Sequence, residues 1–265
     1  MTTKSLVITG CLLAMGLVHC SKVLDAVGNV GSYLVSDEEE VAMGANFHQE
    51  ITGDGSGFSM YTDKPSYNAA LVSYVDSLGQ LIASNQTDRP DIKYTFTVID
   101  DDTTVNAFAT PGGYVYLYTG LILQAEYESE IASVIAHELG HITKRHGVKQ
   151  LVANSTTDFI LDLIVGDSTM LRSVVDLANG LSFLKYSRDN EYEADSLAVE
   201  YTTSAGLNPT GVKTFMEYLA SLGDVFEPLA THPDGDNRVE AIERVIGQQD
   251  ASVLTRPNPY RKVSP

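Results

Sequence analysis

The stretch that decides the fold is Glu130-Ile-Ala-Ser-Val-Ile-Ala-His-Glu-Leu-Gly-His-Ile142. Its apolar residues recur every three or four positions, which predicts an amphipathic helix. His137 and His141 are four residues apart and lie one above the other on one helix face, so both imidazoles reach one ion. Zinc binds histidine nitrogen at about 2.0–2.1 Å and, in catalytic sites, takes three protein ligands and a water. The stretch therefore predicts a zinc-binding helix.

Glu138 is the candidate catalytic residue of this helix. It lies about 100° round the helix from His137. Its carboxylate is therefore expected beside the ion instead of on it, where a general base takes a proton from water. At this chain's His and Glu frequencies, such a motif arises by chance in roughly one sequence in a hundred.

The third ligand has to come from elsewhere in the chain. His146 lies about 140° off the ligand face if the helix continues past His141. The metzincin pattern requires a glycine and a histidine three and six residues past the second ligand, and Lys144 and Gly147 occupy those positions. His48 has no accompanying motif and is interpreted as a residue on the surface of a helix.

Carboxylates remain, and Asn190-Glu-Tyr-Glu-Ala-Asp195 offers a suitable pair. Glu191 and Asp195 are four residues apart and share a helix face. A zinc-bound imidazole normally donates its other N–H to a carboxylate. One helix can therefore supply Glu191 as the metal ligand and Asp195 as the acceptor behind a histidine, while Glu193 faces away. A solvated helix acid is the alternative interpretation of Glu191.

Composition excludes some classes of function. The chain has 265 residues, 17 basic and 35 acidic, and a formal net charge of −18. Apolar residues make up 43% and charged residues 20%, which is ordinary for a globular protein of one or two domains. No nucleic-acid partner is expected, because phosphates would meet repulsion instead of basic side chains.

The first residues have the pattern of a secretory signal peptide. Lys4 precedes a mostly apolar run, Leu6 to Val18, which is short for a membrane span. Leu17-Val-His-Cys20 resembles the lipobox of bacterial lipoproteins, and Cys11 has a similar context but follows few apolar residues. We expect a signal peptide over residues 1–19 and lipidation of Cys20.

The two cysteines also limit the metal chemistry. Both lie in the first twenty residues, so the remaining chain forms no internal disulfide and no cysteine-ligated metal site. Residues 20–35 are expected to be a linker.

The rest of the chain predicts helices, a small sheet, and more helices. Ser36-Asp-Glu-Glu39 is a capping box that starts a helix to about residue 51. Further expected helices cover residues 67–83, 129–145, 190–203, 209–222 and 235–246, and expected strands cover 93–99 and 114–118. This order favours one α+β domain over residues 36–248, mainly helical with a small antiparallel sheet. Residues 151–186 fit either a lid or packed helices, and residues 249–265 are expected to be a free, Pro-containing tail.

Four motifs in combination resemble a known family. They are His137–His141, Ser187–Asp195, Asn106–Gly113 and Thr231-His-Pro233. Together they resemble metallopeptidase family forty-eight, the HtpX-like gluzincins related to the CAAX prenyl proteases, over about residues 36–246. Without the membrane spans of those relatives, the chain is similar to the periplasmic lipoprotein branch. The resemblance implies a zincin-like (gluzincin) metallopeptidase domain with one Zn²⁺ per chain.

The resemblance also implies roles for individual residues. Asn106–Tyr118 is similar to the family's edge strand, which would bind an extended peptide through main-chain hydrogen bonds. The implied substrate-binding residues are Ala109, Thr110, Pro111, Gly112 and Gly113. Arg188 would hold the acidic neighbourhood together. His232 would approach the zinc and either block its open position or polarise the substrate, and a structural role fits this histidine as well.

Two functions follow from these expectations. The first is a zinc endopeptidase that hydrolyses unfolded or misassembled cell-envelope proteins in the bacterial periplasm, tethered to the outer membrane by a lipid anchor. The second is a largely latent, zinc-stabilised chaperone or assembly factor for outer-membrane proteins, with His232 in the fourth zinc position. The expected partners are envelope polypeptides and the outer-membrane assembly machinery.

Overall fold

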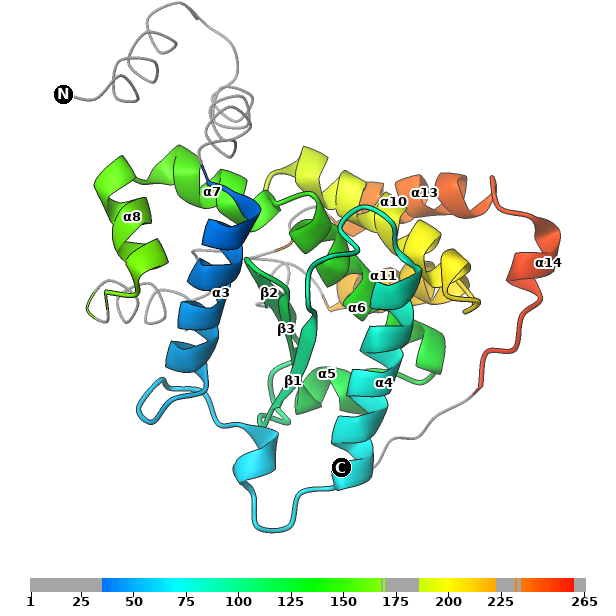
Figure 1. Cartoon of the computed structure of the whole chain (residues 1–265). Coiled ribbons are helices and arrows are strands. Elements are labelled where there is room, and N and C mark those ends of the chain that lie inside the picture. Colours follow the sequence, from blue (N-terminus) through cyan, green and yellow to red (C-terminus); the bar gives the residue numbers. More distant parts are fainter. Residues whose placement is uncertain (1–34, 168, 170–185, 223–231, 233–234, 260–265) are drawn as a thin grey trace, which may run out of the picture.

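The computed structural model describes residues 35–167, 169, 186–222, 232 and 235–259 (Figure 1). The helices before the sheet are α3 (Asp37–Ile51), the short η1 (Tyr61–Asp63) and α4 (Ala69–Asn85). The strands are β1 (Thr95–Ile99), β2 (Ala107–Thr110) and β3 (Tyr114–Tyr118). The helices that follow are α5 (Thr119–Gln124), α6 (Glu128–Thr143), α7 (His146–Asn154), α8 (Thr157–Val165), α10 (Arg188–Ser204), α11 (Thr210–Ser221), α13 (Gly235–Ile246) and α14 (Ala251–Leu254).

The sheet has the strand order β1-β3-β2. Strand β3 is parallel to β1, with Thr95 opposite Tyr114, and antiparallel to β2, with Ala107 opposite Leu117. The mainly helical α+β fold is therefore confirmed, but the sheet is mixed and not purely antiparallel. The reason is that residues 107–110, whose pattern suggests a turn or an edge, form a third strand that reverses the chain between β1 and β3.

Both faces of the sheet are buried. Alternate residues of β3 point to opposite faces. Val115 and Leu117 pack into a core with α4 and α6, while Tyr116 and Tyr118 pack into a second core with α3, α7 and α8. Phe108 of β2 stacks on Tyr116 with 4.7 Å between ring centroids. Figure 1 shows these layers, with α3 (blue) on one side of the sheet and α4 (cyan) and α6 (green) on the other.

Close packing of α6 on α10 positions the residues of the site. A Cβ added to Gly140 would lie 3.2 Å from the Cα of Ala194, so glycine at this position lets the two helices approach. Ala136 and Ala198, both completely buried, keep the neighbouring contacts short. Acidic side chains on α10 consequently reach the histidine face of α6.

Serine side chains cap the starts of α3 and α10, and the capping box that the sequence predicts at Ser36 is confirmed. The Ser36 hydroxyl accepts a hydrogen bond from the Glu39 N–H at 3.2 Å, and the Glu39 carboxylate accepts one from the Ser36 N–H at 2.7 Å. Ser187 caps α10 in the same way, since its hydroxyl accepts from the Asn190 N–H at 3.3 Å. Both helices thus begin within two residues of the positions that their sequences predict.

Helix α6 ends two residues earlier than the sequence pattern predicts. Arg145 has a left-handed φ of 58° and starts α7, so His146 turns back towards α6. The Arg145 guanidinium donates to the carboxylate of Glu40 at 2.7 Å and to the carbonyl of Val35 at 2.6 Å. These bonds hold the chain in a conformation that a non-glycine residue rarely adopts.

The prediction that residues 249–265 form a free tail is wrong for the part that the structure describes, residues 249–259. Residues 251–254 form α14, and the Asn208 amide donates to the carbonyls of Leu254 and Arg256 at 3.4 and 3.0 Å. The Arg256 guanidinium donates in turn to the carbonyls of Thr203 and Leu207. The segment to residue 259 is therefore bound to the domain. The expected signal peptide, Cys20, most of the linker and residues 170–185 of the possible lid lie outside the described residues.

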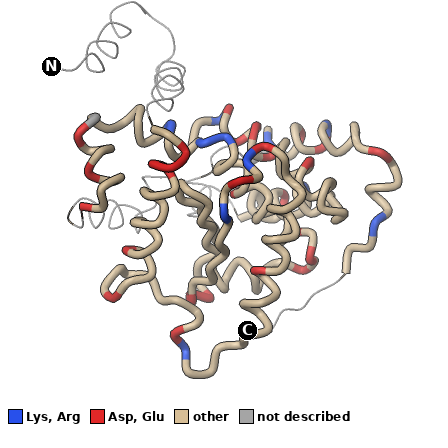
Figure 2. The backbone as a smooth tube through the Cα atoms, in the orientation of Figure 1, with Lys and Arg blue, Asp and Glu red and all other residues tan. Residues whose placement is uncertain are grey.

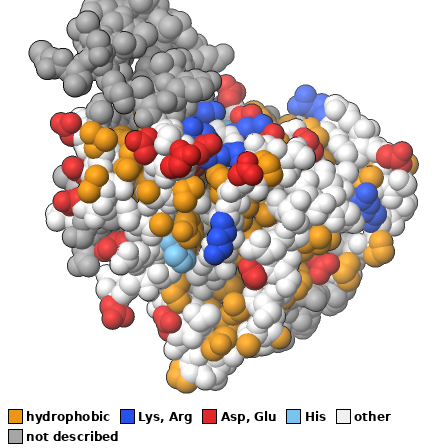
Figure 3. Space-filling model, in the orientation of Figure 1, with side chains coloured by type: hydrophobic (Ala, Val, Ile, Leu, Met, Phe, Trp, Pro, Cys, Tyr) orange, Lys and Arg blue, Asp and Glu red, His pale blue; other side chains and the backbone are white. Residues whose placement is uncertain are grey.

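Charge is dispersed over the described part of the chain. Figure 2 shows acidic residues on helices and loops throughout the domain. In the space-filling view of the same face, basic side chains gather beside acidic ones at the upper edge (Figure 3). The acidic side chains on this face are therefore spread out and do not gather in one patch. Within the described ranges, none of the helices has the length and hydropathy that a bilayer span requires.

Candidate active site and metal centre

Two histidines of α6 form one side of the site. His137 and His141 lie one helical turn apart, and their Nε2 atoms are 3.0 Å from each other. Tyr186 stacks on His141, with ring centroids 3.8 Å apart and an angle of 14° between the planes, and restricts its rotation. The shared helix face that the four-residue spacing predicts is therefore present.

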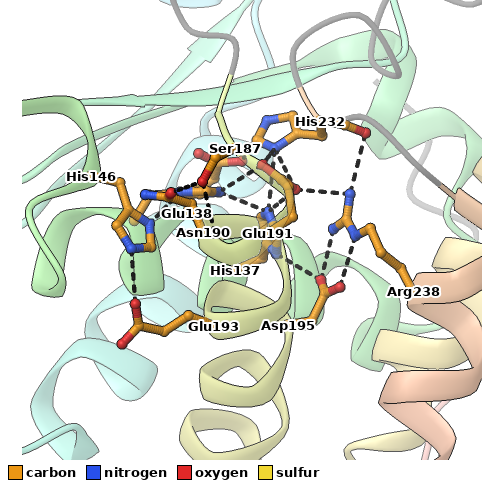
Figure 4. Close-up of polar contacts among 11 residues, drawn as sticks. His137, Glu138, His146, Ser187, Asn190, Glu191, Glu193, Asp195, His232 and Arg238 are labelled. Carbon is orange, nitrogen blue, oxygen red and sulfur yellow. Dashed lines mark hydrogen bonds and ion pairs between the residues drawn. The ribbon is translucent and has the colours of Figure 1, made fainter. Parts of the chain in front are cut away.

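Glu191 of α10 forms the opposite side. Its carboxylate is completely buried and lies 3.5 Å from Nε2 of both His137 and His141. His232 completes the group, because its Nδ1 lies 3.0 Å from Glu191 Oε1 and 3.3 Å from His137 Nε2. Figure 4 shows His137, Glu191 and His232 converging from α6, α10 and the segment before α13.

These four donors fit a metal ion. One ligand atom from each of His137, His141, Glu191 and His232 lies within 4.8 Å of all the others. Tetrahedral coordination at about 2.0–2.1 Å, as for zinc, separates the ligand atoms by about 3.3 Å. The observed separations of 3.0, 3.3 and 3.5 Å lie around that value. Two imidazole nitrogens and a carboxylate buried together are a donor set that a cation stabilises.

Asp195 lies directly behind His137, as the four-residue spacing from Glu191 predicts. The Nδ1–H of His137 donates to Asp195 Oδ1 at 3.0 Å, which leaves Nε2 free to bind an ion. Asp195 is 2% exposed, so the bond is protected from water. This contact fixes both the tautomer and the orientation of the ring.

A second chain of contacts fixes His141. Its Nδ1 lies 2.9 Å from Nδ1 of His146, and Nε2 of His146 lies 3.1 Å from the Glu193 carboxylate. Since the carboxylate only accepts, His146 carries its proton on Nε2 and accepts at Nδ1 from His141. Glu193 does face away from the candidate metal centre, but it contacts the centre through His146.

Arg238 holds the acidic side of the site together. Its guanidinium donates two bonds of 2.7 Å to Asp195 and lies 2.8 Å from Glu191 Oε2 (Figure 4). It also donates to the carbonyl of His232 at 3.3 Å. The family resemblance implies this role for Arg188, but Arg188 lies exposed at the start of α10. The buried cation of the site is therefore Arg238.

Glu138 lies beside the group of ligands. Its side chain is buried, and Oε1 is 3.6 Å from Nε2 of His232. Among the described residues, its Oε2 is buried without a hydrogen-bond partner. Burial raises the pKa of this carboxyl, an effect that His232 and His137 oppose in part. Such a group is suited to accepting a proton near neutral pH.

Burial and neighbouring charges set the protonation of the ligands. Burial alone would lower the pKa of His137, but hydrogen bonds and charge from two carboxylates raise it to about 9. Burial lowers the pKa of His141 well below its ordinary value. Burial would raise the pKa of Glu191, yet His232 and Arg238 hold it well below its ordinary value. His141 and Glu191 are thus in the forms that bind a cation, while His137 has to release a proton to do so.

Two hollows flank the ligands along β2. One hollow adjoins His137 and Glu138, and its empty space, including the part open to solvent, is about 560 Å³. A smaller hollow adjoins His141, with about 200 Å³ of empty space counted in the same way. Ala109, Thr110 and Pro111 line the smaller hollow.

The two glycines that are expected to bind substrate are not among the residues that line these hollows. Gly112 and Gly113 form the turn after β2, with φ of 83° and 107°. The Gly112 N–H donates to the Glu40 carboxylate at 3.3 Å, which ties this turn to α3.

Sequence reasoning missed three residues of the site. Arg238 had a usable signal, because it lies four residues before Ile242 and therefore on the apolar face of α13. His146 was missed because the sequence pattern predicts that α6 continues past Thr143, and a continued helix places His146 off the ligand face. Tyr186 stands alone before Ser187 and carries no signal of its own.

Comparisons with known proteins agree with this geometry. Residues 48–246 match peptidase family M48. The chain is 28% identical over 258 residues to the beta-barrel assembly-enhancing protease of Yersinia pestis, covering 89% of this chain and 50% of that protein. It is 27% identical over 247 residues to the metalloprotease YcaL of Escherichia coli strain K12, covering 91% of this chain and 92% of YcaL.

A mitochondrial relative extends the comparison. The chain is 32% identical over 165 residues to the mitochondrial metalloendopeptidase OMA1 of Arabidopsis thaliana, covering 60% of this chain and 33% of that protein. The chain thus spans about half the length of the beta-barrel assembly-enhancing protease and a third of this OMA1. Because the family match covers most of the chain, including every residue of the candidate metal centre, the chain belongs to peptidase family M48.

Proposed function

We propose that this chain is a zinc endopeptidase that cleaves unfolded or misassembled proteins of the cell envelope. The observation that carries the proposal is the convergence of His137, His141 and Glu191. Beside them lies Glu138, whose Oε2 has no hydrogen-bond partner among the residues that the structure describes. Two histidines and one glutamate are a common ligand set of catalytic zinc. The family implies a metal cofactor, and zinc is the ion that these donors suit best.

Each residue then has a definite part in the reaction. Zinc in such a site supplies a Lewis acid that polarises the scissile carbonyl and makes water nucleophilic near neutral pH. Glu138 takes the proton from the attacking water and returns it to the leaving amine. Asp195 holds His137, His146 holds His141, and Arg238 holds the carboxylate of Glu191.

Among the described strands, β2 lies at the edge of the sheet, and its outer side supports the binding of an extended peptide. The Tyr118 N–H of β3 donates to the Asn106 carbonyl at 3.1 Å, so alternate residues of this strand face β3. Ala107 and Ala109 between them direct their backbone groups to the other side, along the two hollows. A peptide added there binds through its main chain, which tolerates many sequences and requires an unfolded segment.

The envelope substrates are proposed from relatives and from the N-terminal pattern. Two relatives are named for beta-barrel assembly, which suggests links to the outer-membrane assembly machinery. We place the chain in the bacterial periplasm, anchored through a lipid on Cys20. A Cys20→Ala chain should then leave the membrane fraction for the soluble fraction, and unchanged membrane association would contradict the anchor.

The substrate proposal is tested with one outer-membrane β-barrel protein in two states. The chain should cleave this protein when it is kept unfolded and spare it when it is folded, because only an extended segment can pair with β2. Equal cleavage of both states, or of neither, would contradict the proposed selection.

A second candidate is a latent chaperone or assembly factor, and the position of His232 favours it. With Nδ1 of His232 as fourth donor, coordination is complete without water, as in structural zinc sites. We propose that His232 acts as a cap in the resting enzyme and leaves when substrate enters. A cap of this kind predicts a low resting activity and is compatible with hydrolysis once it leaves.

Truncating this cap gives a clear expectation. The His232→Ala chain should hydrolyse a peptide about tenfold faster or more per zinc-loaded molecule, because the resting enzyme no longer spends most of its time capped. X-ray absorption at the zinc edge should count three imidazoles in the unchanged chain and two in the variant. Markedly lower activity at unchanged zinc content would show that His232 assists catalysis, and unchanged activity would show a purely structural role.

A further inference from the structure

The junction between α6 and α7 is a single residue with an unusual backbone. Among the described residues, Arg145 is the one non-glycine residue with a positive φ, at 58°. In this left-handed region the Cβ atom is crowded by the following carbonyl oxygen, so the conformation persists where neighbouring groups enforce it. The next residue, His146, is 1% exposed, and its Nδ1 lies 2.9 Å from Nδ1 of the candidate ligand His141. The strained residue is therefore the one that directs His146 to the metal centre.

A buried carboxylate from a distant helix holds this junction. Glu40 of α3 is completely buried, and its Oε2 accepts a hydrogen bond of 2.7 Å from Nε of Arg145. The same guanidinium donates to the carbonyl of Val35 at 2.6 Å. Because a guanidinium is planar and rigid, two bonds to different groups fix its direction and restrain the backbone that carries it. A carboxylate buried to this extent is stable only with such partners.

A second guanidinium ties the end of α6 to the same carboxylate. Nη1 of Arg89 donates to Glu40 Oε1 at 3.0 Å and to the carbonyl of Ile142 at 3.2 Å. Ile142 directly follows His141, so Glu40 holds the last turn of α6 as well as the residue that starts α7. Figure 1 shows the start of α3 (blue) beside α7. One buried acid thus restrains both sides of the turn between the two helices.

The same acid also reaches the candidate substrate strand. Its Oε1 accepts from the Gly112 N–H at 3.3 Å, in the turn after β2. Glu40, Arg145 and His141 all line the smaller hollow. Replacing Glu40 therefore affects this turn as well as the α6–α7 junction, and variants of Arg145 separate the two effects.

We propose that Arg145 and Glu40 are positioning residues of the metal centre, which hold His146 where it orients His141 for the ion. This role rests on the proposed zinc peptidase function and deepens it. His146 contacts the ring nitrogen of His141 that faces away from the other ligands. Neither Arg145 nor Glu40 belongs to the four converging donors, so both act through His146. The loss of such an outer contact typically weakens metal binding by about 10–100-fold.

Two variants that differ by one methyl group test this role. Arg145→Ala and Arg145→Gly both lose the guanidinium, but glycine adopts a positive φ without strain. Arg145→Ala should bind zinc about 10–100-fold more weakly than the unchanged chain. Arg145→Gly should bind zinc about fivefold or more tightly than Arg145→Ala, because its backbone keeps His146 within reach of His141. The measurement is the zinc dissociation constant by competition with a chromophoric chelator at one pH, with each chain shown to be folded by circular dichroism.

Glu40→Gln tests the anchor of the junction. Glutamine keeps the shape of the side chain but loses the charge that holds the two guanidinium groups. It should weaken zinc binding in the unchanged chain and weaken it much less in the Arg145→Gly background, where the anchor has no guanidinium of Arg145 to hold. Equal losses in the two backgrounds would contradict a pathway through Arg145. If Glu40→Gln does not fold, the two variants of Arg145 decide the question.

Asn208→Ala is the control for a loss of stability alone. Asn208 is 6% exposed and lies after the end of α10 that is opposite to Glu191, where its amide binds the carbonyls of Leu254 and Arg256. Its replacement should lower the free energy of unfolding and leave the zinc dissociation constant unchanged. Equal zinc affinity in the unchanged chain and in Arg145→Ala, an equal loss in Arg145→Ala and Arg145→Gly, or a similar loss in Asn208→Ala would overturn the positioning role.

Zinc binding and cleavage separate this role from the peptidase function itself. If the chain binds zinc but cleaves no unfolded protein, the proposed function fails, while the order of zinc affinities still decides the role of Arg145. If the chain cleaves unfolded protein but the order of affinities is absent, the positioning role fails and the peptidase function stands. A chain that binds no zinc would contradict both.

Discussion

Replacing Glu138 with glutamine should lower peptide hydrolysis by about 10²–10⁴-fold, the contribution typical of a general base. Glutamine has nearly the same shape but neither accepts the proton of the attacking water nor returns it to the leaving amine. The carboxylate does not belong to the group of four converging ligands, so the zinc content should stay near one per chain. The measurement is kcat on an unfolded protein substrate together with metal analysis of the same sample.

The matched control is Glu126→Gln, an exposed acid two residues before α6. This variant removes the same charge near the same helix and should keep full activity. Normal turnover by the Glu138→Gln chain would contradict its role as the base. Loss of zinc from that chain would instead place Glu138 among the groups that hold the metal.

Replacing Arg238 with methionine should destabilise the metal-free domain by about 3–5 kcal/mol, the cost of leaving a buried charge without its partner. Arg238 is 1% exposed and bridges Asp195 to Glu191, so the substitution removes the guanidinium charge from two buried carboxylates. The measurement is the free energy of unfolding in denaturant with a chelator present, which excludes any effect through the metal.

Arg244→Met is the control for this prediction. Arg244 lies on the same helix but is exposed, and within the described part of the chain its guanidinium donates to the carbonyl of Glu240 at 3.3 Å and to no other group. Its replacement should change the free energy of unfolding by less than about 0.5 kcal/mol. A similar small change for Arg238→Met would show that the carboxylates do not depend on this cation.

The sequence predicts the parts of the site that depend on spacing within one helix. His137 and His141 share a face because they are four residues apart, and Glu191 and Asp195 do so for the same reason. The capping box at Ser36 is equally local and equally predictable. Each of these features depends on residues within one turn of one another.

The remaining features depend on how distant segments pack. The parallel pairing of β1 with β3 depends on a short strand that lies between them in the chain, in a stretch whose sequence suggests a turn or the edge of a sheet. His146 reaches His141 because Arg145 adopts a left-handed conformation, and residues after 248 bind to the domain through Asn208. Helical periodicity and turn residues do not determine such contacts, since tertiary packing decides them.

The larger hollow beside His137 and Glu138 belongs to this second group. Residues that line it come from β2 and α6 and from α11, which follows them by more than sixty residues. No local motif marks Phe215 or Met216 as lining a hollow, because both have the helical spacing of ordinary core residues.

Metal reconstitution tests the central claim most directly. The chain is stripped of metal with a chelator, and its hydrolysis of an unfolded protein is then measured as zinc is added back. The stripped chain should be inactive and should regain activity in proportion to zinc, up to one ion per chain, whereas His141→Ala should neither retain zinc nor regain activity. Undiminished hydrolysis by the stripped chain or by His141→Ala would contradict a zinc peptidase built on His137, His141 and Glu191.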